Sequence, residues 1–164
     1  MHGNRGHDEG EPRSEEGKDN GIVMEEMYID AENMVAGRLA SKMAKELLKG
    51  KKVFIVNAEK AVISGEPDYI IKDYREKRER GDPYHGPFYP REPDRLIKRM
   101  VRGMLPIKAA KGRDALKRLR VFISVPDDMS GKKFEKIKNT ENNLKCKSMK
   151  IGDLAQKLGA KKTW

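Results

Sequence analysis

The chain has little of what disulfide-bonded and metal-binding proteins need. It holds a single cysteine, Cys146, among 164 residues, so no internal disulfide can form. Its three histidines, His2, His7 and His85, do not combine with that cysteine into a spaced set of metal ligands. These shortages predict a protein of a reducing, cytoplasmic compartment that holds neither zinc nor another cofactor.

Long hydrophobic runs and catalytic motifs are also missing. No apolar run approaches the roughly 20 residues that cross a bilayer, and the amino terminus carries no apolar stretch like that of a signal peptide. The sequence contains no phosphate loop, no GxGxxG after the first predicted strand and no nucleophile elbow. We therefore expect a soluble, intracellular protein that is not an enzyme and has neither a membrane partner nor a small-molecule substrate.

What the chain does have is positive charge, unevenly placed. Lys and Arg number 36 against 26 Asp and Glu, a net charge of +10. Residues 1–26 hold 3 basic and 8 acidic side chains, so the remainder holds 33 against 18. We predict a disordered acidic extension over residues 1–26 and a single domain over residues 27–164. The extension is a native segment, the product of an upstream start site or an addition for expression, and the sequence does not distinguish these origins.

Apolar periodicity predicts alternating strands and helices. Continuous apolar runs indicate strands at residues 27–29, 53–56, 61–63 and 121–125. Helical spacing indicates helices at residues 35–48, 67–80, 93–104, 113–119 and 151–158, the last capped by Asp153. The order strand, helix, strand favours a right-handed βαβ unit. These elements predict an α/β fold with a small, mainly parallel, four-stranded sheet.

The helix predicted at residues 93–104 is the most informative element. Its expected inner face carries Ile97, Met100, Val101 and Met104. Arg95, Arg99 and Arg102 follow at i, i+4 and i+7 on the opposite face, and Arg113, Lys117 and Arg120 repeat the arrangement on the next predicted helix.

Basic residues are concentrated around these two helices. Residues 72–120 hold 16 basic side chains against 7 acidic ones. A single basic stripe is more often an ordinary solvated face, but two adjacent stripes with few carboxylates favour RNA, because the planar guanidinium group binds phosphate oxygens in pairs and stacks on bases.

A proline-rich loop over residues 81–93 lies between the predicted helices. Its four prolines exclude regular structure and predict a stiff, extended backbone. Its aromatic side chains lie between Arg80 and Arg91, an arrangement suited to stacking on splayed bases. Alternatively, Phe88 and Tyr89 only pin the loop to the domain.

Three segments, taken in chain order, resemble one family. They are DAENMVAGRLASKMAKELLKGKKVFIVNAEKAVISG at residues 30–65, YREKRERGDPYHGPFYPREPDRLIKRM at residues 74–100 and VRGMLPIKAAKGRDALKRLRVFISVP at residues 101–126. Together they are similar to the universal L-thirteen family of large-subunit ribosomal proteins. The segment VPDDM resembles the archaeal and eukaryotic branch of that family, and the lack of the long carboxy-terminal extension of eukaryotic members makes the resemblance archaeal-type.

The resemblance implies a three-layer α/β/α domain that binds large-subunit rRNA, contacts neighbouring large-subunit proteins and supports early subunit assembly. A second role, as a translational regulator that binds messenger RNA away from the ribosome, stays open. The family motif also implies that Gly103, Pro106 and Gly112 form turns whose backbone amides approach RNA, and that Met104 and Leu105 pack in the core.

Combining motif and charge, we predict seventeen RNA-binding residues. They are Arg38, Lys60, Arg75, Arg78, Arg80, Tyr84, His85, Tyr89, Arg91, Arg95, Arg99, Arg102, Lys108, Lys111, Arg113, Lys117 and Arg118.

Overall fold

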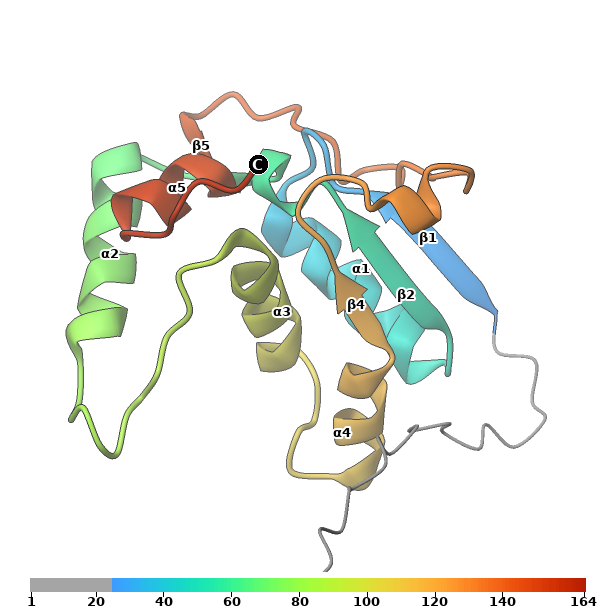
Figure 1. The fold of residues 1–164 in the computed structure, drawn as a ribbon, viewed down its shortest axis with the longest axis horizontal. Coiled ribbons are helices and arrows are strands. Elements are labelled where there is room, and N and C mark those ends of the chain that lie inside the picture. The colour runs from blue at the N-terminus through green and yellow to red at the C-terminus, as the bar shows by residue number, and fades with distance from the viewer. Residues whose placement is uncertain (1–24) are drawn as a thin grey trace, which may run out of the picture.

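A parallel sheet organises the computed structural model, which describes residues 25–164 (Figure 1). Strands β1 (Glu26–Asp30), β2 (Lys52–Val56) and β4 (Leu119–Val121) lie in the order β1-β2-β4, all parallel. The predicted disordered extension lies outside the described residues except for its last two positions, and Glu26 already belongs to β1. Across the described range, no helix is both long and apolar enough to span a membrane.

Helix α1 (Ala36–Leu48) connects β1 to β2, as the apolar spacing predicts. Its buried side includes Leu39, Met43 and Leu47. The helix ends before Gly50, which takes a φ of 101° that favours glycine. The parallel pairing of β1 with β2 confirms the strand, helix, strand unit.

The mixed α/β class is confirmed, but the fourth strand was assigned wrongly. Residues 61–63 were expected in the main sheet, whereas β3 (Val62–Ser64) pairs antiparallel with β5 (Ser148–Lys150) in a separate two-stranded sheet. Among the described residues, the outer edge of β1 has only one further pairing, a single parallel bridge between Ile29 and Glu135. The polar sequence of β5 gave no strand signal, so the pairing of β3 could not be foreseen.

Other parts of the chain cover the two faces of the main sheet to different extents. Ile29, Val53, Ile55 and Leu119 point to one face and are fully buried in the core shared with α1 and α3 (Pro93–Gly103). Tyr28 and Phe54 alternate with them and point to the other face. There the ring of Phe134 meets Tyr28 edge-on at a centroid distance of 6.3 Å. The connection after β4, which includes the short helix η2 (Asp127–Met129), thus supplies the only cover on this face that the described residues show (Figure 1).

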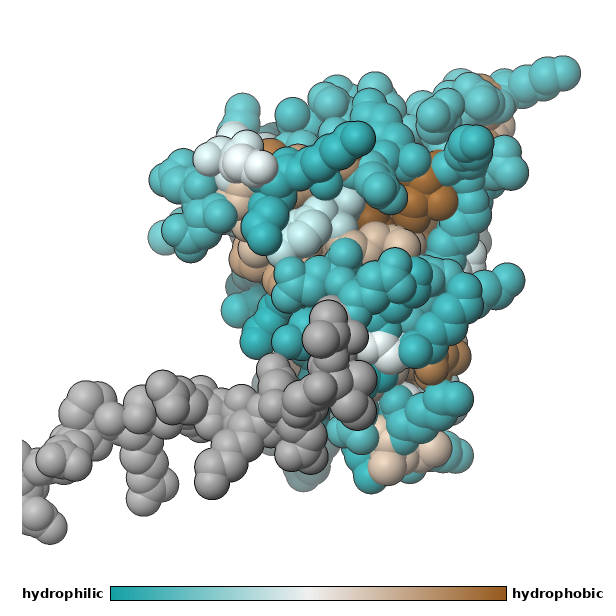
Figure 2. Space-filling model, turned by 90° about the vertical axis from the view of Figure 1, so that its right-hand side faces the viewer, coloured by the Kyte–Doolittle hydropathy of each residue, from teal (hydrophilic) through white to brown (hydrophobic). Residues whose placement is uncertain are grey.

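The remaining helices lie beside the sheet. Helix α2 (Pro67–Glu79) buries Ile70 and Tyr74, as expected, and α5 (Ile151–Lys157) packs against η1 (Ala58–Lys60) and α3. Asp153 was predicted to cap α5, but Lys150 occupies the cap position and Asp153 lies in the first turn. Seen from the side that carries β1, hydrophilic side chains cover most of the surface and apolar ones show only between them (Figure 2).

Two boundaries near α3 correct the sequence analysis. Met104 follows the helix and is 44% exposed, so it does not pack in the core, whereas Leu105 is buried as expected. Helix α4 spans Ala110–Lys117 instead of residues 113–119, and β4 starts at Leu119. Arg120 therefore belongs to a strand and cannot continue a helical stripe with Arg113 and Lys117.

Candidate nucleic-acid interface

Helix α3 presents the predicted row of arginines. Pro93 fits its first position, where no backbone N–H is needed, and Leu96, Ile97 and Val101 are fully buried against the core. Arg95 and Arg102 on the opposite side are exposed and Arg99 is half-buried. Amphipathic spacing therefore fixes the row in place by anchoring the other side of the same helix.

The aromatic loop holds the middle of this row. Tyr89 meets Tyr74 of α2 edge-on at 5.8 Å, and the guanidinium carbon of Arg99 lies 5.3 Å from the centroid of the Tyr89 ring. Burial, followed by the proximity of Tyr89, raises the pKa of Tyr74 above its ordinary value. Tyr89 thus pins the loop to the domain, while Phe88, which is 69% exposed, does not.

The loop tip is ordered by short-range hydrogen bonds. The backbone N–H of Gly86 donates to the Asp82 carbonyl, and the Tyr84 N–H donates to Asp82 Oδ1 over 2.8 Å. The Tyr84 amide and then His85 hold the pKa of Asp82 below its usual value. Gly81 has a φ of 100°, and a Cβ there would clash with the Gly86 carbonyl oxygen. This stiff loop leaves Tyr84 88% exposed.

A hollow opens where α3 turns toward α4. Leu105, Pro106 and Ile107 form an apolar floor, and Arg99, Arg102 and Lys108 surround it. Within residues 25–164, neither the Arg102 guanidinium nor the Lys108 ammonium group makes a hydrogen bond or an ion pair. An apolar floor beside two uncommitted cations, Arg102 and Lys108, suits a nucleobase flanked by phosphates. Ile107 was not predicted as a site residue. The signal that could have indicated it is the apolar triplet Leu105, Pro106 and Ile107, which lies between Arg102 and Lys108 in the sequence.

The contact between Arg99 and the ring of Tyr89 joins this hollow to the loop. A second hollow is lined by Arg78, Arg80, Tyr89 and Arg91, and a third by Tyr89, Arg91 and Arg95. We call the continuous set the arginine surface. It consists of Arg78, Arg80, Tyr89, Arg91, Arg95, Arg99, Arg102 and Lys108.

Two arginines of the arginine surface also donate hydrogen bonds to backbone carbonyls of the fold. Arg78 donates to the carbonyl of Leu158 at the end of α5, and Arg91 Nη1 donates to the Gly159 carbonyl over 3.4 Å. Arg95 makes only a long contact of 3.9 Å with Glu92 among the described residues. The guanidinium groups are therefore positioned by the fold while most of their hydrogen-bonding capacity stays open.

The predicted residues of α4 separate into two groups. Arg113 Nη1 donates to the Lys108 carbonyl over 3.0 Å, so Arg113 adjoins the arginine surface, and Lys111 is exposed on the same helix. Lys117 pairs with Asp114 at 3.5 Å, and Arg118 Nη2 donates to the Leu47 carbonyl over 2.9 Å. Lys117 and Arg118 instead line a different hollow, on the open face of the sheet.

Glycine and proline positions near α4 follow from packing. A Cβ on Gly112 would clash with the carbonyl of Pro106, so α4 approaches the preceding turn as closely as glycine allows. A Cβ on Gly103 would meet open space. Gly112 was expected in a turn but lies within α4, packed against the Pro106 carbonyl, and the approach of its amide to RNA stays a prediction.

Five predicted residues lie apart from the arginine surface. Arg38 is exposed on α1, Arg75 is exposed on α2, and Lys60 of η1 pairs with Glu32 at 3.5 Å. Tyr84 and His85 form the exposed tip of the loop. None of the five lines any of the three hollows described above.

The fold and this surface define a class, namely mixed α/β proteins whose cationic and aromatic surface is typical of RNA-binding proteins. Among residues 25–164, no group of three or more His, Cys, Asp or Glu side chains could hold a metal ion. The features that can bind a ligand in the described region are cations, aromatic rings and apolar hollows.

Comparison with known proteins identifies the family. Residues 24–128 match the family described as Ribosomal protein L13. The chain is 47% identical over 136 residues to the large ribosomal subunit protein uL13 of Methanosarcina barkeri, covering 81% of this chain and 97% of that protein. It is 48% identical over 128 residues to the protein of the same name from Archaeoglobus fulgidus, covering 78% of this chain and 82% of that protein. The chain belongs to the L13 family of ribosomal proteins, which is not a family of enzymes.

Proposed function

We propose that this chain is a structural protein of the large ribosomal subunit that binds rRNA through the arginine surface. The observation that carries the proposal is the row Arg95, Arg99 and Arg102 beside a hollow with an apolar floor. Family membership supports the ribosomal assignment, because relatives 47% and 48% identical are named as large-subunit proteins. The comparisons give no support to a regulatory role away from the ribosome.

The chemistry of the arginine surface supports contacts to phosphate and to unpaired bases. The uncommitted guanidinium of Arg102 presents a planar set of donors that matches phosphate oxygens. The apolar floor of Leu105, Pro106 and Ile107 accommodates a base or ribose without stranding a polar group. Each phosphate contact is individually modest, so the sum depends strongly on salt.

A charge-removal experiment tests the assignment. We expect the triple change Arg95→Ala, Arg99→Ala and Arg102→Ala to weaken binding to purified large-subunit rRNA and to reduce the slope of log affinity against log salt by about 2. Filter binding or anisotropy across a salt series measures this slope, and circular dichroism checks that the domain stays folded.

Helix α1 offers a control with the same loss of charge. Lys42, Lys45 and Lys49 lie on its solvent side, where Lys42 donates to the Lys138 carbonyl and Lys49 pairs with Glu46. Changing these three lysines to alanine should leave the salt slope nearly unchanged. If both triple variants lost the same affinity, binding would depend on net charge alone, and the arginine surface would not be the site.

Neighbouring large-subunit proteins complete the proposed setting, together with a role early in subunit assembly. Arg38, Arg75, Tyr84 and His85 are exposed away from the arginine surface and are the positions from which further contacts can extend. Reconstitution of the large subunit without this protein should stall at a precursor that its addition rescues. Normal assembly in its absence would contradict the assembly role.

A further inference from the structure

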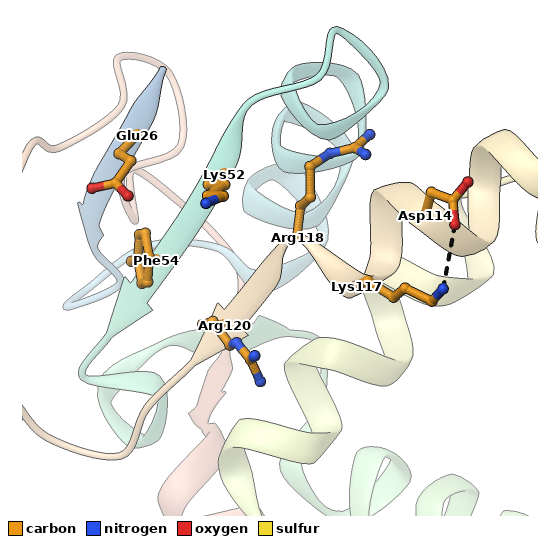
Figure 3. Close-up of a pocket in the computed structure, with 7 residues that line it drawn as sticks. All are labelled: Glu26, Lys52, Phe54, Asp114, Lys117, Arg118 and Arg120. Atoms are coloured by element: carbon orange, nitrogen blue, oxygen red, sulfur yellow. Dashed lines mark ion pairs between the residues drawn. The ribbon is translucent and has the colours of Figure 1, made fainter. Parts of the chain in front are cut away.

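The open face of the sheet carries a hollow that the arginine surface does not include. Its lining comes from all three strands and from the end of α4, with a volume of about 470 Å³ (Figure 3). The lining residues are Glu26, Lys52, Phe54, Asp114, Lys117, Arg118 and Arg120. This face was expected to lie beneath a third layer, but within residues 25–164 only the connection after β4 reaches it, on the β1 side.

An aromatic stack ends at this hollow. The rings of Tyr28 and Phe54 lie parallel on neighbouring strands, with centroids 4.9 Å apart and planes 11° apart. The Tyr28 end is already covered, because Lys132 Nζ lies 5.0 Å from the Tyr28 centroid and Phe134 meets the same ring edge-on. Phe54 lines the hollow on the side of β4. The stack is therefore closed at one end and open at the other.

The strand register determines what lies beside the open end. Arg120 is the partner of Phe54 on β4, yet its guanidinium group does not stack on the ring and points away from it (Figure 3). No hydrogen bond, ion pair or ring contact within the described residues holds that guanidinium group. No ring from the described part of the chain continues the stack above β4, and an uncommitted cation lies at its edge.

The charge around the hollow favours an anionic ligand. Lys52, Lys117 and Arg120 line it together with Arg118, against two carboxylates, Glu26 and Asp114. Glu26 accepts a hydrogen bond from the Tyr28 hydroxyl over 2.7 Å, and Asp114 pairs with Lys117 at 3.5 Å, so both carboxylates have partners within the fold. A flat π-face beside excess cations is the combination that binds an unpaired nucleotide.

We propose that this hollow binds one unstacked nucleotide of single-stranded RNA, whose base continues the Tyr28 and Phe54 stack and whose phosphate contacts Arg120 and Lys117. The base lies over β4 against the free face of Phe54, and its flanking phosphates face the cations at the end of α4. The site is separate from the arginine surface and gives the protein a second, sequence-tolerant RNA contact on its opposite sheet face.

The test measures stacking directly on the full chain. The probe is a short single-stranded oligouridylate that carries one 2-aminopurine. Uridines stack weakly, so the free probe is fluorescent, and its fluorescence is quenched when the base stacks on the protein. We expect quenching with the unaltered protein and roughly tenfold weaker binding for Phe54→Leu, because this change removes the aromatic face on which the base stacks. Arg120→Gln should weaken binding less and keep the quenching at saturation, because the ring remains.

Matched variants separate this site from the arginine surface and from nonspecific contacts with exposed rings. Tyr69→Leu removes an aromatic ring that is 71% exposed on α2 and should change neither affinity nor quenching. The triple arginine variant of α3 should lose rRNA affinity but still quench the probe. Unchanged quenching and affinity in a folded Phe54→Leu variant would overturn the proposal, whereas unchanged rRNA binding in the triple variant would overturn only the arginine surface.

A protein occupant would give a different result. If the hollow instead receives a segment of a neighbouring ribosomal protein, the oligouridylate probe will not be quenched, and Phe54→Leu will abolish a protein crosslink from this face within the assembled subunit. That outcome would also overturn the proposal.

Discussion

Helices α1 and α3 pack against each other and arise from the same sequence pattern, but their polar sides differ. Both bury an apolar stripe in one core, with Leu39, Met43 and Leu47 on α1 and Leu96, Ile97 and Val101 on α3. On α1, Lys42 donates to the Lys138 carbonyl, and Lys49, directly after the helix, pairs with Glu46. On α3, the Arg102 guanidinium has no partner among the described residues.

The difference shows what amphipathic spacing can and cannot indicate. Periodicity identifies the buried side of a helix, since that side is fixed by burial of apolar area. It does not indicate whether the opposite cations are used inside the fold or left for a ligand. Only the intramolecular partners distinguish the two helices, and these partners come from distant segments such as the residues around Lys138.

The largest expected effects on stability come from the buried apolar side chains that both helices contribute to the common core. Leu39→Ala and Leu96→Ala each remove a fully buried side chain and should lower the free energy of unfolding by about 2–5 kcal/mol. Urea denaturation measures both. If Leu96→Ala lowered the free energy of unfolding much less than Leu39→Ala, α3 would not be anchored by the common core, and the comparison between the two helices would fail.

A pair of glycines tests the next largest effect. Gly112→Ala would force a Cβ against the Pro106 carbonyl and should cost about 1–3 kcal/mol. Gly103→Ala, at the end of α3, meets open space and should leave stability unchanged or raise it by up to about 1 kcal/mol. Thermal unfolding of both variants checks the contrast. Equal losses at the two positions would refute the close packing inferred for Gly112.

The core could be predicted from the sequence more fully than the sheet. Helix α1 followed from unbroken apolar spacing and from Gly50. The last strand was expected at residues 121–125 but forms at Leu119–Val121, because its length is set by its partner β2, which ends at Val56 before Asn57 turns into a left-handed conformation with a φ of 56°. Pairing between distant strands is not encoded in local periodicity.

The candidate site divides in the same way. The row on α3 followed from local spacing, and the structure joins it to Tyr89 and Arg91, which the sequence also indicated. Arg118 shows the limit. It was expected to face RNA, yet it is half-buried and donates to the end of α1, a contact 71 residues away along the chain. The hollow beside Phe54 was not foreseen, because its lining is assembled across three strands.

Arg118 provides a prediction of intermediate size. Arg118→Met keeps the aliphatic stem but removes the hydrogen bond to the Leu47 carbonyl, so the free energy of unfolding should fall by about 1 kcal/mol. Affinity for rRNA should change less than in the triple arginine variant of α3. If the Arg118→Met variant lost rRNA affinity but kept its full free energy of unfolding, Arg118 would act in RNA binding, as the sequence predicts, and not in stabilising the fold.

The smallest expected effect concerns the ion pairs that close the end of α1. Lys49 and then Lys51 lower the pKa of Glu46 from its ordinary value of 4.5. Because the folded pKa is depressed, the stabilisation is present above pH 4.5 and is lost as the pH falls through the lower, folded value. Glu46→Gln should therefore flatten the pH dependence of stability in that acid range and cost less than about 1 kcal/mol at neutral pH.

Glu92 at the start of α3 supplies the matched measurement. Its pKa is also lowered, first by its own backbone amide and then by that of Arg91. The pKa of Glu92 is lowered mainly by backbone amides, whereas that of Glu46 is lowered by flexible lysine side chains. The change in the free energy of unfolding caused by Glu92→Gln should therefore respond less to added salt than the change caused by Glu46→Gln. Chemical denaturation between pH 3 and pH 7 at low and high salt compares the two. An identical salt response would mean that the polar sides of α1 and α3 are held by the same kind of interaction.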